Sequence, residues 1–120
     1  MKVVISGSRS IQSLNAEMKS RIDKIIKLNS EILIGDAYGI DSLVQAYLYK
    51  KDYRNVTVWY SRILRNNIGN WKTIHIPGGF VKRDIAMHSQ AEYGLAIWDG
   101  KSRGTKRNIE QMKGKVRVIQ

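Results

Sequence analysis

The chain has 120 residues, no cysteine and a formal net charge of +11, because 21 Lys and Arg stand against 10 Asp and Glu. This length is typical of one domain with an ordinary apolar core, and the lack of cysteine excludes disulfides and thiolate-based zinc or redox sites. The apolar stretches are too short to cross a membrane and the charge favours anionic partners, so we expect residues 1–120 to form a single cytoplasmic domain with no membrane partner.

The first half of the chain alternates between strand and helix patterns. Residues 2–6 form a predicted buried strand, and apolar side chains recur at helical spacing over 14–28. A second short apolar strand is predicted over 31–34, followed by a second helix over 40–50 with one apolar stripe. Residues 56–60 are β-branched or aromatic, which predicts a third strand.

The second half begins with a segment that fits neither period. Residues 62–79 are longer than the usual connection in a compact domain, which favours a functional loop. Helical spacing returns over 80–91, and an apolar run over 93–98 predicts a fourth strand. A last helix is predicted over 105–113, and a fifth strand over 115–119 is suited to a sheet edge because it carries basic residues.

This alternation predicts an α/β fold, a Rossmann-like doubly wound three-layer sandwich with a parallel five-stranded sheet in the order 3-2-1-4-5. Every strand-to-helix turn then lies at the carboxyl edge of the sheet. Ligands of such sheets bind where the strand order reverses, which here is the crevice between strands one and four.

Glycine-bearing turns follow strands one, two and four, and a further one precedes the third helix. Such turns gather backbone N–H groups that hold phosphate, and the turn over 99–105 also supplies hydroxyl groups and cations at a helix start. The predicted ligand- and phosphate-binding residues are Gly7, Ser8, Arg9, Gly35, Asp36, Ala37, Gly39, Asp41, Lys82, Arg83, Asp99, Gly100, Ser102, Gly104 and Thr105.

Each turn also has a purely structural interpretation. Ser8 or Ser10 is suited to cap the first helix, because serine is a preferred N-cap residue. Asp41 and Thr105 are equally suited to cap the second and the last helix. In the ligand-binding interpretation, Asp99 accepts ribose hydroxyls, since the cations around it keep the carboxylate ionised.

The residues, in this order and spacing, resemble the SLOG superfamily of Rossmann-like domains, and most closely its small stand-alone members. The superfamily includes the cytokinin-activating phosphoribohydrolases and the DNA-processing DprA proteins. The resemblance spans nearly the whole chain, and it implies a phosphate on the last glycine turn with Arg83 completing the site. It is carried by Gly7-Ser8-Arg9, the turn over 35–41, Arg83 with Met87 ahead of Ala91-Glu92-Tyr93, and Gly104-Thr105.

The last glycine turn departs from the phosphoribohydrolase pattern, Pro-Gly-Gly-x-Gly-Thr-x-x-Glu. Gly100-Lys101-Ser102 replaces Pro-Gly-Gly, and Asn108 stands where the acidic residue is expected. Cleavage of an N-glycosidic bond usually requires a carboxylate, so the resemblance implies phosphate binding more directly than hydrolysis. The candidates for a displaced catalytic acid are Asp36, Asp41, Asp99 and Glu110.

Aromatic and histidine residues add further expectations. The long loop offers a candidate lid that closes over a base by stacking, formed by Arg62, Arg65 and Trp71; Trp71 is equally suited to an oligomer interface. His75 and His88 lack partners at metal-ligand spacing, so neither a metal nor a cofactor is predicted. The resemblance implies a homo-oligomer, a dimer or larger, with interface candidates Tyr47, Tyr49 and Tyr53.

Three functions remain open. The first is binding of a nucleotide or nucleotide-derived ligand, such as a nucleoside phosphate, an ADP-ribose or NAD-derived molecule or a cyclic nucleotide, for sensing or sequestration. The alternative is an N-glycosidase or phosphoribohydrolase-like enzyme acting on nucleoside monophosphates. The third is DNA or RNA binding, which the net charge favours, although interleaved aromatic residues for stacking single strands are missing.

Overall fold

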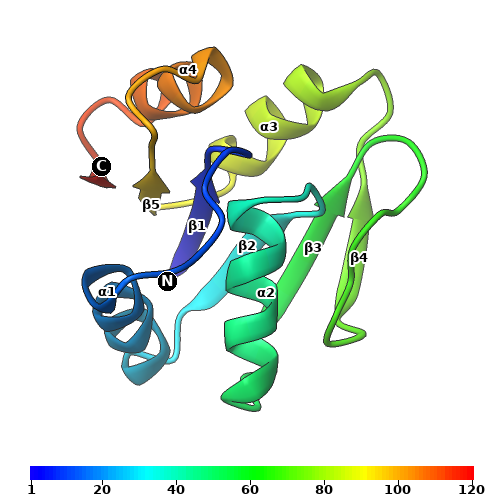
Figure 1. The fold of residues 1–120 in the computed structure, drawn as a ribbon. Coiled ribbons are helices and arrows are strands. Elements are labelled where there is room, and N and C mark those ends of the chain that lie inside the picture. The colour runs from blue at the N-terminus through cyan, green and yellow to red at the C-terminus, as the bar shows by residue number, and fades with distance from the viewer.

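Six parallel strands form one sheet in the order β4-β3-β2-β1-β5-β6 (Figure 1). The computed structural model describes residues 1–120 and confirms an α/β architecture with a parallel sheet, compatible with a Rossmann-like fold. The strands are β1 (Lys2–Gly7), β2 (Glu31–Gly35), β3 (Val56–Tyr60), β4 (Lys72–His75), β5 (Tyr93–Ile97) and β6 (Val116–Ile119). The helices are α1 (Ala16–Lys27), α2 (Ile40–Lys50), α3 (Phe80–Ser89) and α4 (Arg103–Gln111).

The prediction of five strands was wrong, because the segment assigned to a long loop contains β4. This strand pairs in parallel with β3, from Thr57 beside Lys72 to Tyr60 beside His75. It has only four residues and is mostly exposed, since it lies at the edge of the sheet. A strand that is exposed in this way has no apolar run to reveal it. The predicted order 3-2-1-4-5 is otherwise retained inside the six-stranded sheet.

Helices cover both faces of the sheet. Neighbouring strand residues point to opposite faces, so Ile5 packs in one cluster with Ile22 of α1 and Val44 of α2. On the other face, Val4 packs with Met87 of α3. Burial of both faces accounts for the continuous apolar runs that the sequence shows in β1 and β2. None of the four helices is long and apolar enough to cross a bilayer.

The helix starts differ from the expected caps. Asn15 caps α1, with its Oδ1 accepting a backbone N–H at 2.9 Å, so neither Ser8 nor Ser10 has this role. Ser102 caps α4, and Thr105 donates its N–H to the Ser102 hydroxyl at 3.5 Å from inside the first turn. The N-cap of α4 is therefore three residues earlier in the chain than the predicted Thr105.

The other two helices start at glycines. Gly39 precedes α2 with φ 86° and Gly79 precedes α3 with φ 103°, conformations that favour glycine. A side chain at Gly39 would also collide with the backbone of Arg9, which passes 2.5 Å from the position of its Cβ. Asp41 lies in the first turn of α2 and not at its cap. Its side chain is therefore not engaged in N-cap bonding.

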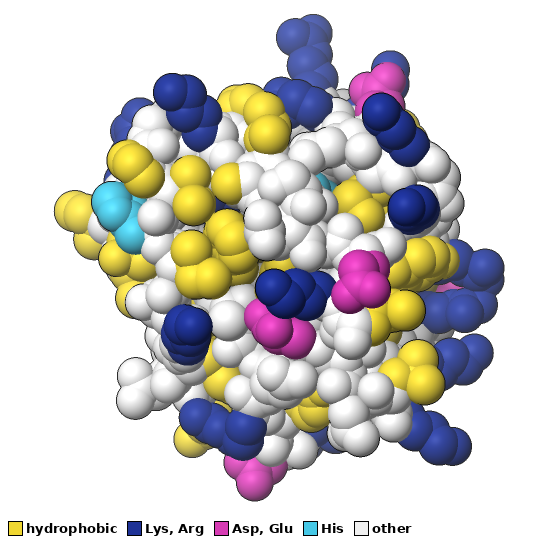
Figure 2. All heavy atoms as spheres, turned by 180° about the vertical axis from the view of Figure 1, so that it is seen from behind, with side chains coloured by type: hydrophobic (Ala, Val, Ile, Leu, Met, Phe, Trp, Pro, Cys, Tyr) yellow, Lys and Arg dark blue, Asp and Glu magenta, His cyan; other side chains and the backbone are white.

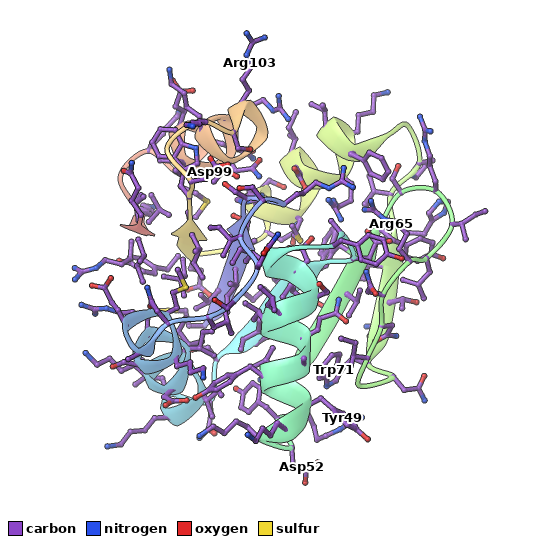
Figure 3. The ribbon with its side chains drawn as sticks, in the orientation of Figure 1. Tyr49, Asp52, Arg65, Trp71, Asp99 and Arg103 are labelled. Carbon is purple, nitrogen blue, oxygen red and sulfur yellow. The ribbon has the colours of Figure 1, made fainter.

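Trp71 is a core residue and not part of a lid. Its side chain is 5% exposed, and its Nε1 donates to the carbonyl of Tyr53 at 2.9 Å. Trp71 directly precedes β4, so it lies at the amino edge of the sheet, opposite to the glycine turns. Figure 3 accordingly shows Trp71 near Tyr49, toward the end of α2, and far from α4. This placement corrects both roles expected for Trp71, in a lid and in an interface.

Among the tyrosines expected at an interface, two are engaged within the chain. The hydroxyl of Tyr47 donates to Asp23 at 2.6 Å, and that of Tyr53 donates to the carbonyl of Ser30 at 2.5 Å. Tyr49 is 57% exposed. Tyr49 is thus the member of this set whose ring is available to a partner.

We predict that Trp71→Ala lowers the free energy of unfolding by about 3–5 kcal/mol, the cost of emptying a buried aromatic site. Tyr49→Ala is the matched control, because this exposed aromatic residue lies at the same end of the sheet, and its effect should stay within about 0.5 kcal/mol. Urea unfolding followed by circular dichroism measures both. Wild-type stability in Trp71→Ala would contradict the core assignment.

Candidate functional site

A pocket of about 190 Å³ opens at the carboxyl edge of the sheet. Its walls come from the end of β1 and the turn after it, the turn after β2 with the start of α2, the loop after β3, one side of α3, and the turn after β5 with α4. The strand order reverses between β1 and β5, so the pocket lies at the place where open α/β sheets bind ligands. The lining residues are Ser6, Gly7, Arg9, Ala37, Asp41, Arg65, Phe80, Arg83, Asp84, Met87, Ser102, Gly104, Thr105, Arg107 and Asn108.

The pocket brings together residues from all the predicted glycine turns but one. The predicted binding residues that line it are Gly7, Arg9, Ala37, Asp41, Arg83, Ser102, Gly104 and Thr105, joined by Arg65 from the candidate lid. The lining residues that sequence reasoning did not nominate are Ser6, Phe80, Asp84, Met87, Arg107 and Asn108. Among these, Asp84 could have been found from the sequence, because it directly follows Arg83, which was predicted to bind the ligand.

Asp36 lies behind the pocket wall and holds two arginines. It is 1% exposed, and its Oδ1 accepts from Nη2 of Arg65 at 2.8 Å and from Nη1 of Arg83 at 3.0 Å. Its Oδ2 accepts from the backbone N–H of Arg65 at 3.0 Å and from its Nε at 3.3 Å. Burial by itself raises the pKa of Asp36, but the bonds from Arg65 and the charge of Arg83 outweigh it and lower this pKa below its ordinary value.

These contacts correct the expectation that Asp36 meets the ligand or acts as the catalytic acid. Both oxygens of Asp36 are occupied by guanidinium and backbone donors. The carboxylate therefore positions Arg65 and Arg83, which do line the pocket. Arg83 also donates from Nη1 to the carbonyl of Trp59 at 3.1 Å, so its guanidinium is fixed from two sides.

Asp41 is a buried carboxyl group on the pocket wall. Its Oδ2 accepts the backbone N–H of Ala37 at 3.1 Å. Burial raises the pKa of Asp41 to about 7, against the opposing charge of Arg83. Gly35 makes this arrangement possible, because a Cβ there would come within 2.5 Å of Asp41 Oδ2 and 2.6 Å of Arg83 Nη1. Gly35 thus acts by its small size and not by contact with a ligand.

Asp84 supplies a second carboxylate from α3. Its Oδ1 lies 2.8 Å from Nε of Arg83, an ion pair without the alignment of a hydrogen bond, and its Oδ2 accepts from Nδ2 of Asn108 at 3.3 Å. Asn108 occupies the sequence position where the phosphoribohydrolase pattern has its acid. The pocket therefore holds a carboxylate beside that position, contributed by α3 and not by α4. The other amide atom, Asn108 Oδ1, is buried without a hydrogen-bond partner.

The turn between β5 and α4 is held by Asp99. Its Oδ1 accepts the N–H groups of Lys101 at 2.8 Å and Ser102 at 2.7 Å, and its Oδ2 accepts the Ser10 hydroxyl at 2.7 Å. These hydrogen bonds lower the pKa of Asp99 to about 2, and the bond from the Ser102 N–H makes the largest contribution. Asp99 does not line the pocket. This corrects its expected roles as a ribose ligand and a catalytic acid, because its oxygens are occupied by donors from its own turn and from Ser10.

Ser8 joins the first and last glycine turns. Its hydroxyl lies 3.2 Å from the hydroxyl of Thr105 and accepts the N–H of Asp99 at 3.0 Å. Ser8 is buried and stands behind the lining residues Gly7 and Arg9. It therefore fixes the geometry of the two turns that face each other across the pocket.

The remaining predicted residues lie outside the pocket. Lys82 folds over Gly78, and Glu110 is exposed on the outer side of α4. Gly100 has φ 80° and packs against Gln120. Arg62 is exposed and lies 5.5 Å from the centre of the Phe80 ring, next to the pocket but not in its wall.

The two histidines belong to different structural environments. His75, on β4, bonds through Nε2 to the carbonyl of Ser61 at 2.6 Å. His88 is buried under α3, with Nδ1 2.8 Å from the carbonyl of Asp84 and Nε2 3.2 Å from the Ser6 hydroxyl. Burial lowers the pKa of His88. His88 therefore supports the pocket wall as a neutral side chain.

Arginine side chains outnumber carboxyl groups among the residues that line the pocket. Four arginines line it, Arg9, Arg65, Arg83 and Arg107, against the two carboxyl groups of Asp41 and Asp84. Guanidinium groups bind phosphate and carboxylate groups through paired hydrogen bonds. On the face seen in Figure 2, by contrast, basic side chains are scattered, with one near the centre between two acidic side chains, and they form no continuous stripe. The pocket therefore presents four guanidinium groups on one concave surface.

Comparison with protein-family models, curated proteins and solved structures found no match to this chain.

We predict that Asp41→Asn removes a pH dependence of stability. The folded-state pKa of about 7 exceeds the ordinary value of 3.8, so the proton on Asp41 stabilises the fold at low pH, and this contribution is lost as the pH rises toward 7. The loss approaches about 1.4 kcal/mol per pH unit for one proton. Urea unfolding between pH 5 and 8 should show the variant gaining stability relative to wild type up to pH 7.

Asp99→Asn is the matched control for this titration. The lowered pKa of Asp99 gives a contribution that is fully present above the unfolded-state pKa and is lost only in acid. Its stability difference from wild type should stay constant between pH 5 and 8. Parallel curves for Asp41→Asn and wild type would mean that Asp41 is already ionised at pH 5.

Proposed function

We propose that the protein binds a phosphorylated nucleotide or nucleotide-derived ligand in this pocket, for sensing or sequestration. The observation that carries the proposal is the convergence of four arginines with the glycine turns after β1 and β5 in one concave site. This convergence occurs at the strand-order reversal of a parallel sheet. The resemblance to the SLOG superfamily supports the same class of ligand.

The phosphate group is best served by the start of α4. The first N–H groups of a helix have no partner within the helix, and the helix dipole favours an anion there. Gly104 lines the pocket, and the atom nearest to its missing Cβ is Nη2 of Arg107 at 3.7 Å. This open space beside a guanidinium suits a phosphate bound by backbone and side chain together.

A sugar hydroxyl suits the centre of the pocket. Asp84 fixes the amide of Asn108 by accepting from its Nδ2, which leaves Oδ1 as a buried acceptor without a donor. A buried polar atom without a partner is costly. A ribose hydroxyl supplies the missing donor after a small shift of the amide, whereas the dianionic phosphate group of a nucleotide has no O–H to donate.

A second candidate function, cleavage of an N-glycosidic bond in a nucleoside monophosphate, is favoured by the two carboxyl groups of the pocket. Asp84 lies beside Asn108, and the pKa of Asp41 is raised to about 7 by burial. Two carboxyl groups in different environments within one site are typical of acid–base catalysis. In this reaction Asp84 would stabilise the cation that develops on the sugar as the C–N bond breaks, and Asp41 would give a proton to the departing base. Water would then add to the anomeric carbon and return a proton to Asp41.

Isothermal titration at low salt against AMP, ADP-ribose, NAD and cyclic AMP tests the binding proposal. We expect at least one of these to bind, and Arg107→Ala to weaken that binding roughly tenfold or more, since a charge-assisted hydrogen bond contributes about 1.5–3 kcal/mol. Arg103→Ala is the matched control, because Arg103 is on the same helix, outside the pocket, and extends away from it (Figure 3). No binding by the wild type, or equal losses in both variants, would contradict the proposal.

Release of free base from nucleoside monophosphates tests the second candidate. Hydrolysis by the wild type should fall at least roughly a hundredfold in Asp84→Asn, the usual range for a lost acid or base. Glu110→Gln, on the exposed side of α4, should retain full activity. A flat time course with the wild-type protein would remove this candidate and leave the binding function in place.

A further inference from the structure

Phe80 is an aromatic side chain left open at the rim of a polar pocket. It is the first residue of α3, it lines the pocket, and it is 39% exposed. Neither of the two core clusters includes it. A large apolar ring in this position is not explained by packing of the fold, because the sheet faces are filled by other residues.

Three guanidinium groups surround the Phe80 ring. The guanidinium carbon of Arg65 lies 4.4 Å from the ring centre, that of Arg62 lies 5.5 Å away and that of Arg83 lies 5.9 Å away. These distances are within the range of cation–π attraction. The ring is therefore held among planar cations, two of which also line the pocket.

The ring and its neighbours are fixed before any ligand arrives. Asp36 holds the guanidinium groups of Arg65 and Arg83. Gly79, just before Phe80, donates its N–H to the buried hydroxyl of Ser61 at 2.8 Å, which ties the start of α3 to the end of β3. Such preorganisation reduces the entropy that a ligand loses on binding.

We propose that Phe80 and Arg65 form a stacking subsite for the heteroaromatic base of the ligand, an inference that rests on the proposed nucleotide-binding function. Planar bases stack on aromatic rings and on guanidinium planes, and this stacking tolerates any base because each has a π face. Phe80 has no hydrogen-bonding group, so its ring offers no polar contact to sugar hydroxyls or phosphate oxygens. The feature therefore selects for a base.

The subsite also gives the ligand a direction in the pocket. The phosphate lies at the start of α4, near Gly104 and Arg107, and the base lies at the start of α3, over Phe80. Asp84 of α3 and Asn108 of α4 bond to each other across the interval, so the sugar lies against this pair. The order phosphate, sugar, base then runs from α4 to α3.

The test compares AMP with ribose 5-phosphate, which differs from it by the absence of the base. Wild-type protein should bind AMP more tightly than ribose 5-phosphate by roughly fivefold to a hundredfold, the range expected for one stacked base. In Phe80→Ala this preference should disappear, with the affinity for ribose 5-phosphate unchanged. Phe80→Trp should keep the preference, since its ring also stacks.

Val81→Ala is the matched control, because Val81 is the next residue of α3, is similarly exposed and does not line the pocket. It should leave both affinities unchanged. Thermal unfolding of each variant, with and without ribose 5-phosphate, verifies that the fold and the phosphate part of the pocket are intact.

The outcomes separate this subsite from the function on which it rests. Binding of neither compound by the wild type overturns the subsite, and the proposed function is overturned with it when ADP-ribose, NAD and cyclic AMP also fail to bind. Equal affinities for the two compounds, or an AMP preference that survives in Phe80→Ala, overturn the subsite alone. A change of molecular mass in solution for Phe80→Ala, with the AMP preference kept, would assign the ring to contact with a second copy of the chain instead.

Discussion

The carboxylate of Asp36 is removed from water at the end of β2 and is held there by two guanidinium groups. A buried charge is tolerated only when it is paired and fully hydrogen-bonded, and Asp36 meets this condition through Arg65 from the loop after β3 and Arg83 from α3. Gly35 leaves the room that this approach needs. Because both arginines also line the pocket, two of its four guanidinium groups are positioned by this one carboxylate.

The same network divides the acidic residues into two classes. Asp36 and Asp99 have their oxygens occupied by donors from the chain itself, so they build the site. Asp41 and Asp84 face the pocket and differ in environment, since Asp41 is deeply buried and Asp84 is beside Arg83 and Asn108. Whether the pocket only binds a nucleotide or also cleaves it therefore depends on Asp41 and Asp84, and not on Asp36 and Asp99.

Sequence reasoning identified the edge of the sheet at which the pocket lies, because turns after parallel strands must meet there. It also nominated Arg83, Gly104 and Thr105, which line the pocket. It misjudged Asp36 and Asp99, because a glycine turn with an acid looks the same in sequence whether the acid points to a ligand or bonds to its own neighbours. It passed over Phe80, because an aromatic residue at a helix start is also typical of ordinary packing.

The sequence by itself determined the α/β alternation, the parallel sheet and its two covered faces, since apolar periodicity reports how each segment is buried. The tertiary structure alone decided that Lys72–His75 forms an edge strand and that Trp71 is a core residue at the amino edge. It also decided that a carboxylate at position 36 meets a guanidinium at position 83. Such pairings join segments far apart in the chain, and they follow from how helices and loops pack on the sheet, which no local pattern encodes.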